Sequence, residues 1–333
     1  MKNVKPENPE FKYKPYILSS CDYNTRFKGS AGGVVSEIIR YMFEKGYINS
    51  ALTFYFDRKN FYLPEIAYSF DEYNITGSIY HEIDIVSFIK KNINSFTDRF
   101  LVTALPCQVK AIKEIAKRNK KEVFVISLTC SAQQNIEATY FLLDYLGIKK
   151  EKVEVLKYRG NGWPSGIYIR TDDGKEFKVG NIDSIWMYMF HSYIFSLDRC
   201  LTCSDTFGIK SDVIVADPWL ERYLKKEKTG ATITVPNSEK GFLVIKNAIK
   251  DKYLCIIEEI PTEEVILSQQ DTIKRKFVQR KHRKLFKKMA GLFRTKIYKN
   301  FIFKNFPELH LRVINAILHK IFFKKYFQNG IIK

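Results

Sequence analysis

Residues 100–130 read FLVTALPCQVKAIKEIAKRNKKEVFVISLTC, and this stretch decides the fold. The apolar runs at 100–105 and 122–130 are typical of buried strands, while segment 107–119 has apolar residues at helical spacing. A strand, a helix and a second strand in this order indicate an α/β arrangement with a parallel sheet. Neighbouring strands of such a sheet end at the same edge, where ligands bind. Cys107 and Cys130 follow the two strands, so we expect them to lie close together.

The segments on either side continue the alternation of strands and helices. We expect a helix over 31–46, a strand over 51–56, a helix over 136–147, a hairpin within 152–179, and strands within 211–219 and 231–237. The predicted fold is α/β: a mixed, largely parallel sheet with flanking helices, a hairpin-containing second half and a basic helical C-terminal tail. The expected boundaries divide the chain into residues 1–150, 151–268 and 269–333.

The positive charge is concentrated at the C-terminus. The 333 residues carry a net charge of +19, of which segment 271–333 supplies +16 from 18 Lys+Arg and two acids. Apolar residues recur in it at helical spacing, namely Phe277, Leu285, Met289, Leu292 and Phe293. Such a segment favours an anionic membrane surface. The alternatives are a helix docked on the body and nucleic-acid binding, which no recognisable module accompanies.

Composition excludes several other classes of protein. A chain with 45% hydrophobic residues can bury a substantial core, so global disorder is not expected. There is no uncharged apolar run of membrane-spanning length, and the first 15 residues do not resemble a secretion signal. We therefore expect a cytoplasmic protein with reduced cysteines, peripheral at the inner face of the membrane if the basic tail binds there.

Four of the six cysteines form a candidate metal centre. Cys200 and Cys203 make up the chain's CxxC pair, whose spacing suits two bonds to one centre. With Cys107 and Cys130 they supply four thiols. A lone cysteine after an apolar strand is often a buried small side chain, and structural zinc sites usually combine two CxxC pairs. Spacing alone leaves a zinc site, an iron–sulfur cluster and a redox dithiol open.

Five sequence blocks, in order, resemble the coenzyme F420 hydrogenase/dehydrogenase beta-subunit family. They are GSAGGVVSEIIRYMFEKGYI (29–48), ALPCQVKAI (104–112), SLTCSAQQN (127–135), YRGNGWPSGIYI (158–169) and RCLTCSDTFGIKSDVIVADPW (199–219). The resemblance implies an oxidoreductase that binds FAD and one 4Fe–4S cluster. Its cysteine positions match Cys107, Cys130, Cys200 and Cys203, which makes these four the expected cluster ligands. Cys21 and Cys255 match no block, so we expect neither to be a ligand.

Two departures from the family pattern bear on function. The usual CHGVPS stretch reads CSAQQN at 130–135, and the ferredoxin-like CxxCxxCxxxC extension of some members is absent from this sequence. Electrons would then come from a separate donor, either a ferredoxin-like protein or a reduced deazaflavin. The catalytic residues are not identified by any motif, because no Ser–His–Asp or paired-carboxylate arrangement stands out.

The resemblance also indicates where the flavin would bind. Glycines before a helix leave free N–H groups that attract phosphate. Arg159 can pair with a phosphate or carboxylate through two hydrogen bonds. The expected cofactor-binding residues are Ser30, Gly32, Gly33, Arg159, Trp163 and Asp217.

A flavin and a cluster together can convert two-electron transfer into one-electron transfer, or the reverse. The polysaccharide-associated relatives within the family, together with the basic tail, favour a role in cell-surface polysaccharide synthesis, with a sugar or lipid-linked glycan as substrate. One alternative is an F420 dehydrogenase or electron-transfer subunit. The other is a non-catalytic zinc-binding scaffold.

Overall fold

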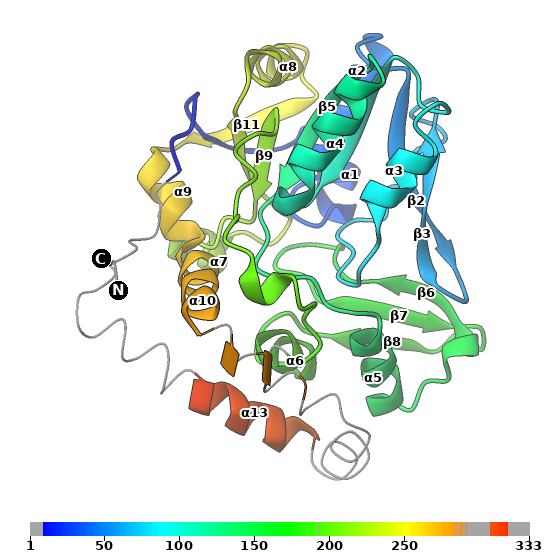
Figure 1. Ribbon diagram of the computed structural model, residues 1–333, viewed down its shortest axis with the longest axis vertical. Helices are drawn as coiled ribbons and strands as arrows, with labels where there is room; N and C mark the ends of the chain where they lie inside the picture. Colours follow the sequence, from blue (N-terminus) through cyan, green and yellow to red (C-terminus); the bar gives the residue numbers. More distant parts are fainter. Residues whose placement is uncertain are drawn as a thin grey trace.

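The computed structural model describes residues 9–318 apart from 193, 283, 286, 289–290 and 292–306. A large mixed sheet forms its centre, and a smaller antiparallel sheet lies below it (Figure 1). The large sheet has eight strands in the order β11-β1-β10-β9-β5-β4-β2-β3. Strands from both sides of residue 150 share this sheet, because β5 pairs with β9 and β1 pairs with β10.

The middle of the large sheet is parallel. Its four strands are β2 (Ser50–Asp57), β4 (Arg99–Ala104), β5 (Glu122–Leu128) and β9 (Val213–Ala216). The outer strands pair antiparallel and are β3 (Phe61–Ala67), β10 (Thr232–Pro236), β1 (Tyr16–Ser20) and β11 (Leu254–Glu259). The predicted α/β fold with a mixed, largely parallel sheet is confirmed.

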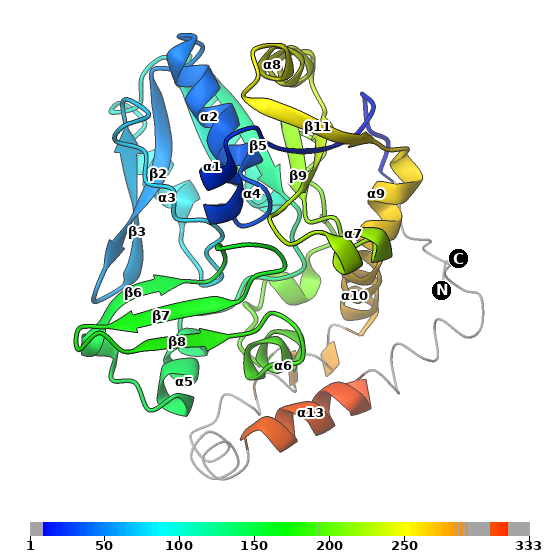
Figure 2. The same ribbon diagram turned by 180° about the vertical axis from the view of Figure 1, so that it is seen from behind.

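Helices cover both faces of this sheet. On one face α2 (Val34–Glu44) and α8 (Glu239–Lys250) bury their apolar stripes together with alternate residues of the strands. The opposite face is covered by α3 (Ile85–Lys91), α4 (Pro106–Arg118) and α9 (Thr262–Ser268). Two short helices, α1 (Tyr23–Lys28) and α7 (Glu221–Lys226), lie in connections behind the sheet in Figure 1 and appear clearly from the other side (Figure 2).

The small sheet contains the predicted hairpin. Strands β6 (Val153–Lys157), β7 (Ile167–Thr171) and β8 (Glu176–Val179) pair antiparallel, and β7 and β8 are joined around Asp172-Asp173-Gly174. Helices α5 (Glu137–Tyr145) and α6 (Ile185–Ser192) pack with this sheet in a second core. The segment between α6 and β9 runs back toward the ends of the parallel strands, which places the CxxC pair beside them.

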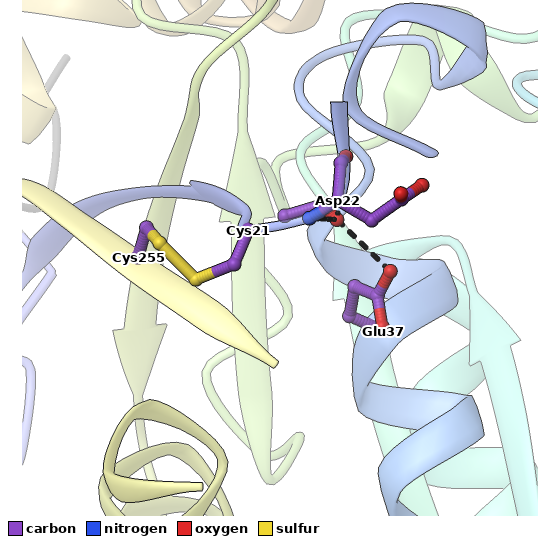
Figure 3. The surroundings of a disulfide bond; sticks show 5 residues. Cys21, Asp22, Glu37 and Cys255 are labelled. Carbon is purple, nitrogen blue, oxygen red and sulfur yellow. Dashed lines mark hydrogen bonds between the residues drawn. A yellow bond between two sulfur atoms is a disulfide. The ribbon is translucent and has the colours of Figure 1, made fainter. Parts of the chain in front are cut away.

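One expectation about the cysteines was wrong: Cys21 and Cys255 are not reduced but form a disulfide, with their Cα atoms 5.2 Å apart. Cys21 follows β1 and Cys255 lies on the adjacent edge strand β11, where it is opposite Ser19. Antiparallel pairing brings the two thiols together although 234 residues separate them in sequence. Figure 3 shows the disulfide beside the start of α2, where Glu37 lies.

The described part of the C-terminal tail packs on the body. Helix α10 (Gln270–Lys281) and helix α13 (Pro307–Leu318) contribute Val278, Leu311 and Ile314 to the core around the small sheet. Of the expected apolar stripe, Phe277 packs against that core and Leu285 is exposed. Met289, Leu292 and Phe293 lie outside the described residues. None of the helices described reaches the length and apolar character needed to cross a membrane.

Candidate metal centre

Two of the four cysteines come from the βαβ unit, as predicted. Cys107 is the second residue of α4, directly after β4, and Cys130 lies two residues beyond β5. Strands β4 and β5 are parallel neighbours, with Thr103 opposite Ile126 and Ala104 opposite Ser127. Both cysteines therefore lie at the same edge of the sheet.

The CxxC pair reaches this edge through specific hydrogen bonds. Cys200 begins a 3₁₀ turn (Cys200–Thr202), and the backbone N–H of Cys203 donates to the Cys200 carbonyl at 3.3 Å. The backbone N–H of Cys130 donates to the Thr206 carbonyl at 3.1 Å, and that of Gln133 donates to Cys200 Sγ at 3.3 Å. These bonds join the turn to the segment after β5. All four predicted ligands thus converge from three segments of the chain.

The four thiols act on one another electrostatically. A hydrogen bond between Cys107 and Cys203, aided by the ammonium group of Lys276, lowers the pKa of Cys203 to about 5, and the same bond together with burial raises the pKa of Cys107. Burial raises the pKa of Cys130 to about 12 and also raises that of Cys200. Cys203 is therefore the thiol of the four that ionises most readily. A metal that bound all four would have to release protons from the others.

Two cations lie beside the thiols. Lys276 on α10 donates to Cys203 Sγ at 3.5 Å and to the Asp205 carbonyl, and its charge lowers the pKa of Cys130 and Cys200 as well. Arg199, at the surface, acts in the same direction on Cys107. Cys107 is itself exposed. The centre thus has two cations beside it and one of its four thiols exposed.

The spacing of the ligands bears on which metal they would hold. Within the described residues, no three His, Cys, Asp or Glu side chains lie close enough to hold one metal ion. Zinc ligated by four thiolates needs Zn–S distances of about 2.3 Å, so its sulfurs crowd around one point. In a 4Fe–4S cluster each cysteine binds a different iron, so the sulfurs lie further apart. Four thiols match the cluster in the number and kind of its donors, and zinc stays an alternative.

Four of the six predicted flavin-binding residues meet at one place. The Arg159 guanidinium forms two hydrogen bonds with the Asp217 carboxylate, at 2.8 and 3.1 Å, and donates to the Ser30 carbonyl at 2.7 Å. Trp163 Nε1 donates to the same carboxylate at 2.8 Å. Arg159 is only 3% exposed. These groups bind one another and hold the 29–33 loop, the 158–165 loop and the end of β9 together.

The two glycines allow the chain to approach itself closely. Gly32 has φ +89°, and a Cβ there would lie 2.9 Å from Cα of Ala231. Gly33 has φ +75° and caps α2, and a Cβ there would lie 2.6 Å from the Thr25 carbonyl oxygen. A side chain at either position would clash with backbone. The spaces beside both glycines are therefore filled by the chain's own backbone, and FAD binding at this loop stays a prediction.

A cavity of about 380 Å³ lies on the other side of the segment that follows Cys130. Its lining includes Tyr62, His81, Glu82 and Tyr140. His81 is 3% exposed and forms a hydrogen bond through Nδ1 with the Tyr158 hydroxyl at 2.9 Å, and burial lowers its pKa to about 4. It is therefore neutral at physiological pH. Gln133, which donates to Cys200, also donates through Nε2 to the His81 carbonyl, so it lies between the cavity and the thiols.

Sequence reasoning missed Lys276 and Gln133. Lys276 is one of 18 basic residues in 271–333, and the sequence does not distinguish it from the others. Gln133 lies in the CSAQQN stretch, so the departure from the family pattern was the available signal. That signal marked an altered position but did not indicate that its backbone N–H would bind a cysteine sulfur.

Comparisons with known proteins give matches to two family models. A family model for the N-terminal part of the coenzyme F420 hydrogenase/dehydrogenase beta subunit matches residues 16–90. A second model, for the C-terminal part of the same beta subunit, matches residues 97–262. The second match includes all four cysteines of the centre and ends before α10. Together the two models account for most of the described chain.

Two relatives extend the comparison. The F420-dependent formate dehydrogenase 1 subunit beta of Methanococcus maripaludis is 23% identical over 256 residues, which are 72% of this chain and 60% of that protein. Among solved structures, a chain of the F420-reducing [NiFe] hydrogenase complex from Methanosarcina barkeri matches with a TM-score of 0.63 at 16% identity. That match covers 82% of this chain and 93% of the other, and it shows a shared fold.

Proposed function

Because the chain belongs to the coenzyme F420 hydrogenase/dehydrogenase beta-subunit family, we propose that it is an oxidoreductase that holds one 4Fe–4S cluster on Cys107, Cys130, Cys200 and Cys203. The observation that carries the proposal is the convergence of these four free thiols beside two cations. A cluster with four thiolate ligands is anionic, and Lys276 and Arg199 offset that charge. A neutral thiol that binds no metal carries no charge, so it would not need these cations beside it.

The family membership favours the cluster over its two rivals. A structural zinc site usually combines two CxxC pairs, whereas this chain has one. A redox dithiol would pair Cys200 with Cys203, yet Cys203 forms its hydrogen bond with Cys107.

We further propose that the protein binds a flavin, FAD, near the cluster. The support is the resemblance of the five sequence blocks and the meeting of Ser30, Arg159, Trp163 and Asp217. Because these four groups bind one another, we assign them the role of holding the walls of the flavin site. When bound, a flavin would exchange electron pairs with a substrate and single electrons with the cluster.

The electron partner is proposed from the exposure of the centre. Cys107 lies at the surface, so the cluster would be within reach of a separate redox protein such as a ferredoxin. A reduced deazaflavin is the alternative donor, since the formate dehydrogenase relative is named as F420-dependent. The chain spans 60% of that relative's length, so its activity does not transfer as a whole.

The identity of the substrate is the most specific part of the proposal. A sugar or lipid-linked glycan in cell-surface polysaccharide synthesis is supported by the sequence blocks and by the basic segment 271–333. Contact of that segment with a membrane surface gains no support from Val278, Leu311 and Ile314, because these apolar side chains face the body. The glycan proposal therefore stands on the sequence alone.

Anaerobic purification followed by iron, zinc and flavin analysis tests the proposal. We expect about four irons and one FAD per chain, with visible absorption from both. Cys107→Ser and Cys203→Ser should each lose most of the iron. The matched control is the double variant Cys21→Ser, Cys255→Ser, which removes the disulfide between β1 and β11 and should keep the iron. A colourless protein with zinc on these four thiols would refute the proposal.

A further inference from the structure

Lys276 is buried beside the cysteines although it lies in the most basic part of the chain. It is on α10 and is 4% exposed, whereas the family match ends at residue 262. Packing fixes its helix on both sides, because Ile273 contacts the core next to β9 and β10 while Val278 is buried in the core of the small sheet. The Lys276 ammonium group is thereby held at Cys203.

The partners of this ammonium group are unusual for a buried lysine. It donates to Cys203 Sγ at 3.5 Å and to the Asp205 carbonyl. Within the described part of the chain no carboxylate forms an ion pair with it. Burying an ammonium group is unfavourable unless an anion lies beside it. The anionic group within its reach is the sulfur of Cys203, so the charge of Lys276 is compensated by the cysteine centre itself.

We propose that Lys276 is a positioning residue for the four-cysteine centre, whose positive charge raises the reduction potential of the cluster bound there. This inference rests on the proposed function, because the anion it requires is the thiolate-ligated cluster. One-electron reduction adds a negative charge to the cluster, and a fixed cation next to Cys203 stabilises the reduced form more than the oxidised form. The same ammonium group holds the 203–208 loop through the Asp205 carbonyl.

The magnitude follows from the short distance. Two unit charges this close interact strongly enough, at the effective dielectric of a protein, to change an equilibrium constant severalfold. Spread over a cluster, and with some water replacing the lysine, the difference between oxidation states will be smaller. We therefore expect loss of the charge to lower the reduction equilibrium constant roughly tenfold, which is about 59 mV for one electron.

The test compares three variants of the reconstituted full chain. Lys276→Gln keeps a hydrogen-bond donor for the Asp205 carbonyl but removes the charge, and Lys276→Arg keeps both. Lys274→Gln removes a lysine from the same helix whose ammonium group bonds to Gln270 instead. Iron content and a mediated dithionite titration, followed by the electron paramagnetic resonance signal of the reduced cluster, give the potential of each.

We expect the reduction potential of Lys276→Gln to be more negative than that of the wild type, by an amount that corresponds to an about tenfold lower equilibrium constant for reduction. The equilibrium constants of Lys276→Arg and Lys274→Gln should lie within about twofold of the wild-type value. An unchanged potential in fully loaded Lys276→Gln would overturn the inference and leave the proposed function standing. If Lys276→Gln loads no iron, wild-type loading of Lys276→Arg supports a need for the charge, whereas loss of iron in both variants overturns it. A wild-type chain that takes up no iron would overturn the proposed function as well.

Discussion

Arg159 and Asp217 show how one buried ion pair can hold several loops. Arg159 has 2% of its side chain exposed and Asp217 has 21%, and the carboxylate also accepts from Trp163 Nε1. Removing one partner of such a pair leaves the other charge buried without compensation, which is much more unfavourable than losing a surface ion pair. The stability of this region therefore depends on Asp217.

Asp217→Asn should lower the free energy of unfolding by about 3 kcal/mol, because Arg159 would keep its charge and lose its counter-charge. Urea denaturation followed by circular dichroism measures this. The control is Glu154→Gln, which breaks the exposed 3.0 Å pair with Arg170, where both side chains are 43% exposed. That loss should stay below about 1 kcal/mol. Equal losses in the two variants would mean that the Arg159 pair is solvated in solution.

At the level of single residues, the ligands could be predicted and their surroundings could not. Cys107 and Cys130 follow strands whose apolar pattern is visible in the sequence, and strand ends determine where a residue lies. Cys200 and Cys203 could be predicted as a pair because their CxxC spacing is visible in the sequence. Lys276 has no comparable pattern, because its role depends on how α10 packs. A disulfide between Cys21 and Cys255 depends on β1 pairing with β11, which no local signal in 16–20 or 254–259 specifies.

The glycine loop before α2 connects two elements of the fold. Gly33 caps α2 in the left-handed region, and its missing Cβ makes room for the Thr25 carbonyl at the end of α1. Gly46, beyond α2, has φ +67°, but nothing lies within 4 Å of the position that a Cβ would take there. Comparing the two positions therefore separates the cost of a left-handed backbone from the cost of a clash with neighbouring atoms.

Gly33→Ala should be destabilising by at least about 1 kcal/mol more than Gly46→Ala. Both variants force alanine into a left-handed conformation, which costs about 1 kcal/mol. Only Gly33→Ala adds a contact of 2.6 Å with backbone, and overpacking of this kind typically costs about 1–3 kcal/mol. Urea midpoints at a common m-value give the comparison. Identical midpoints would show that α1 moves away freely and that the loop is not tightly packed.

Elements with strong periodicity were predicted well. The helix expected at 107–119 is α4, and the strand expected at 100–105 is β4, each within a residue or two at its ends. Strands β1 and β11 were not predicted, because their pairing is long-range and β11, at the edge of the sheet, is mostly exposed. The hairpin of β7 and β8 was predicted, since a turn sequence between two alternating strands is local information.

For the whole molecule, the open question was whether the basic tail docks on the body or faces a membrane. Helix α13 packs on α6, with Leu311 fully buried and Arg312 stacked 5.0 Å from the Tyr188 ring. Tyr145 on α5 donates to Glu308 at 3.2 Å. Sequence could not decide this, because an amphipathic basic helix has the same pattern whether its apolar face meets lipid or protein.

Leu311→Ala should lower the free energy of unfolding by about 2–5 kcal/mol, because it removes a fully buried side chain from the core shared by α13 and α6. Val313→Ala on the same helix is the control; Val313 is 47% exposed, and its loss should change stability by less than about 0.5 kcal/mol. Amide hydrogen exchange in α6 supplies a second measurement, since undocking α13 should speed exchange at 185–192. Equal stability of the two variants, with unchanged exchange in α6, would mean that α13 leaves the body in solution. Its apolar face would then be free for lipid, and the membrane-surface alternative would gain the support that the docked helix denies it.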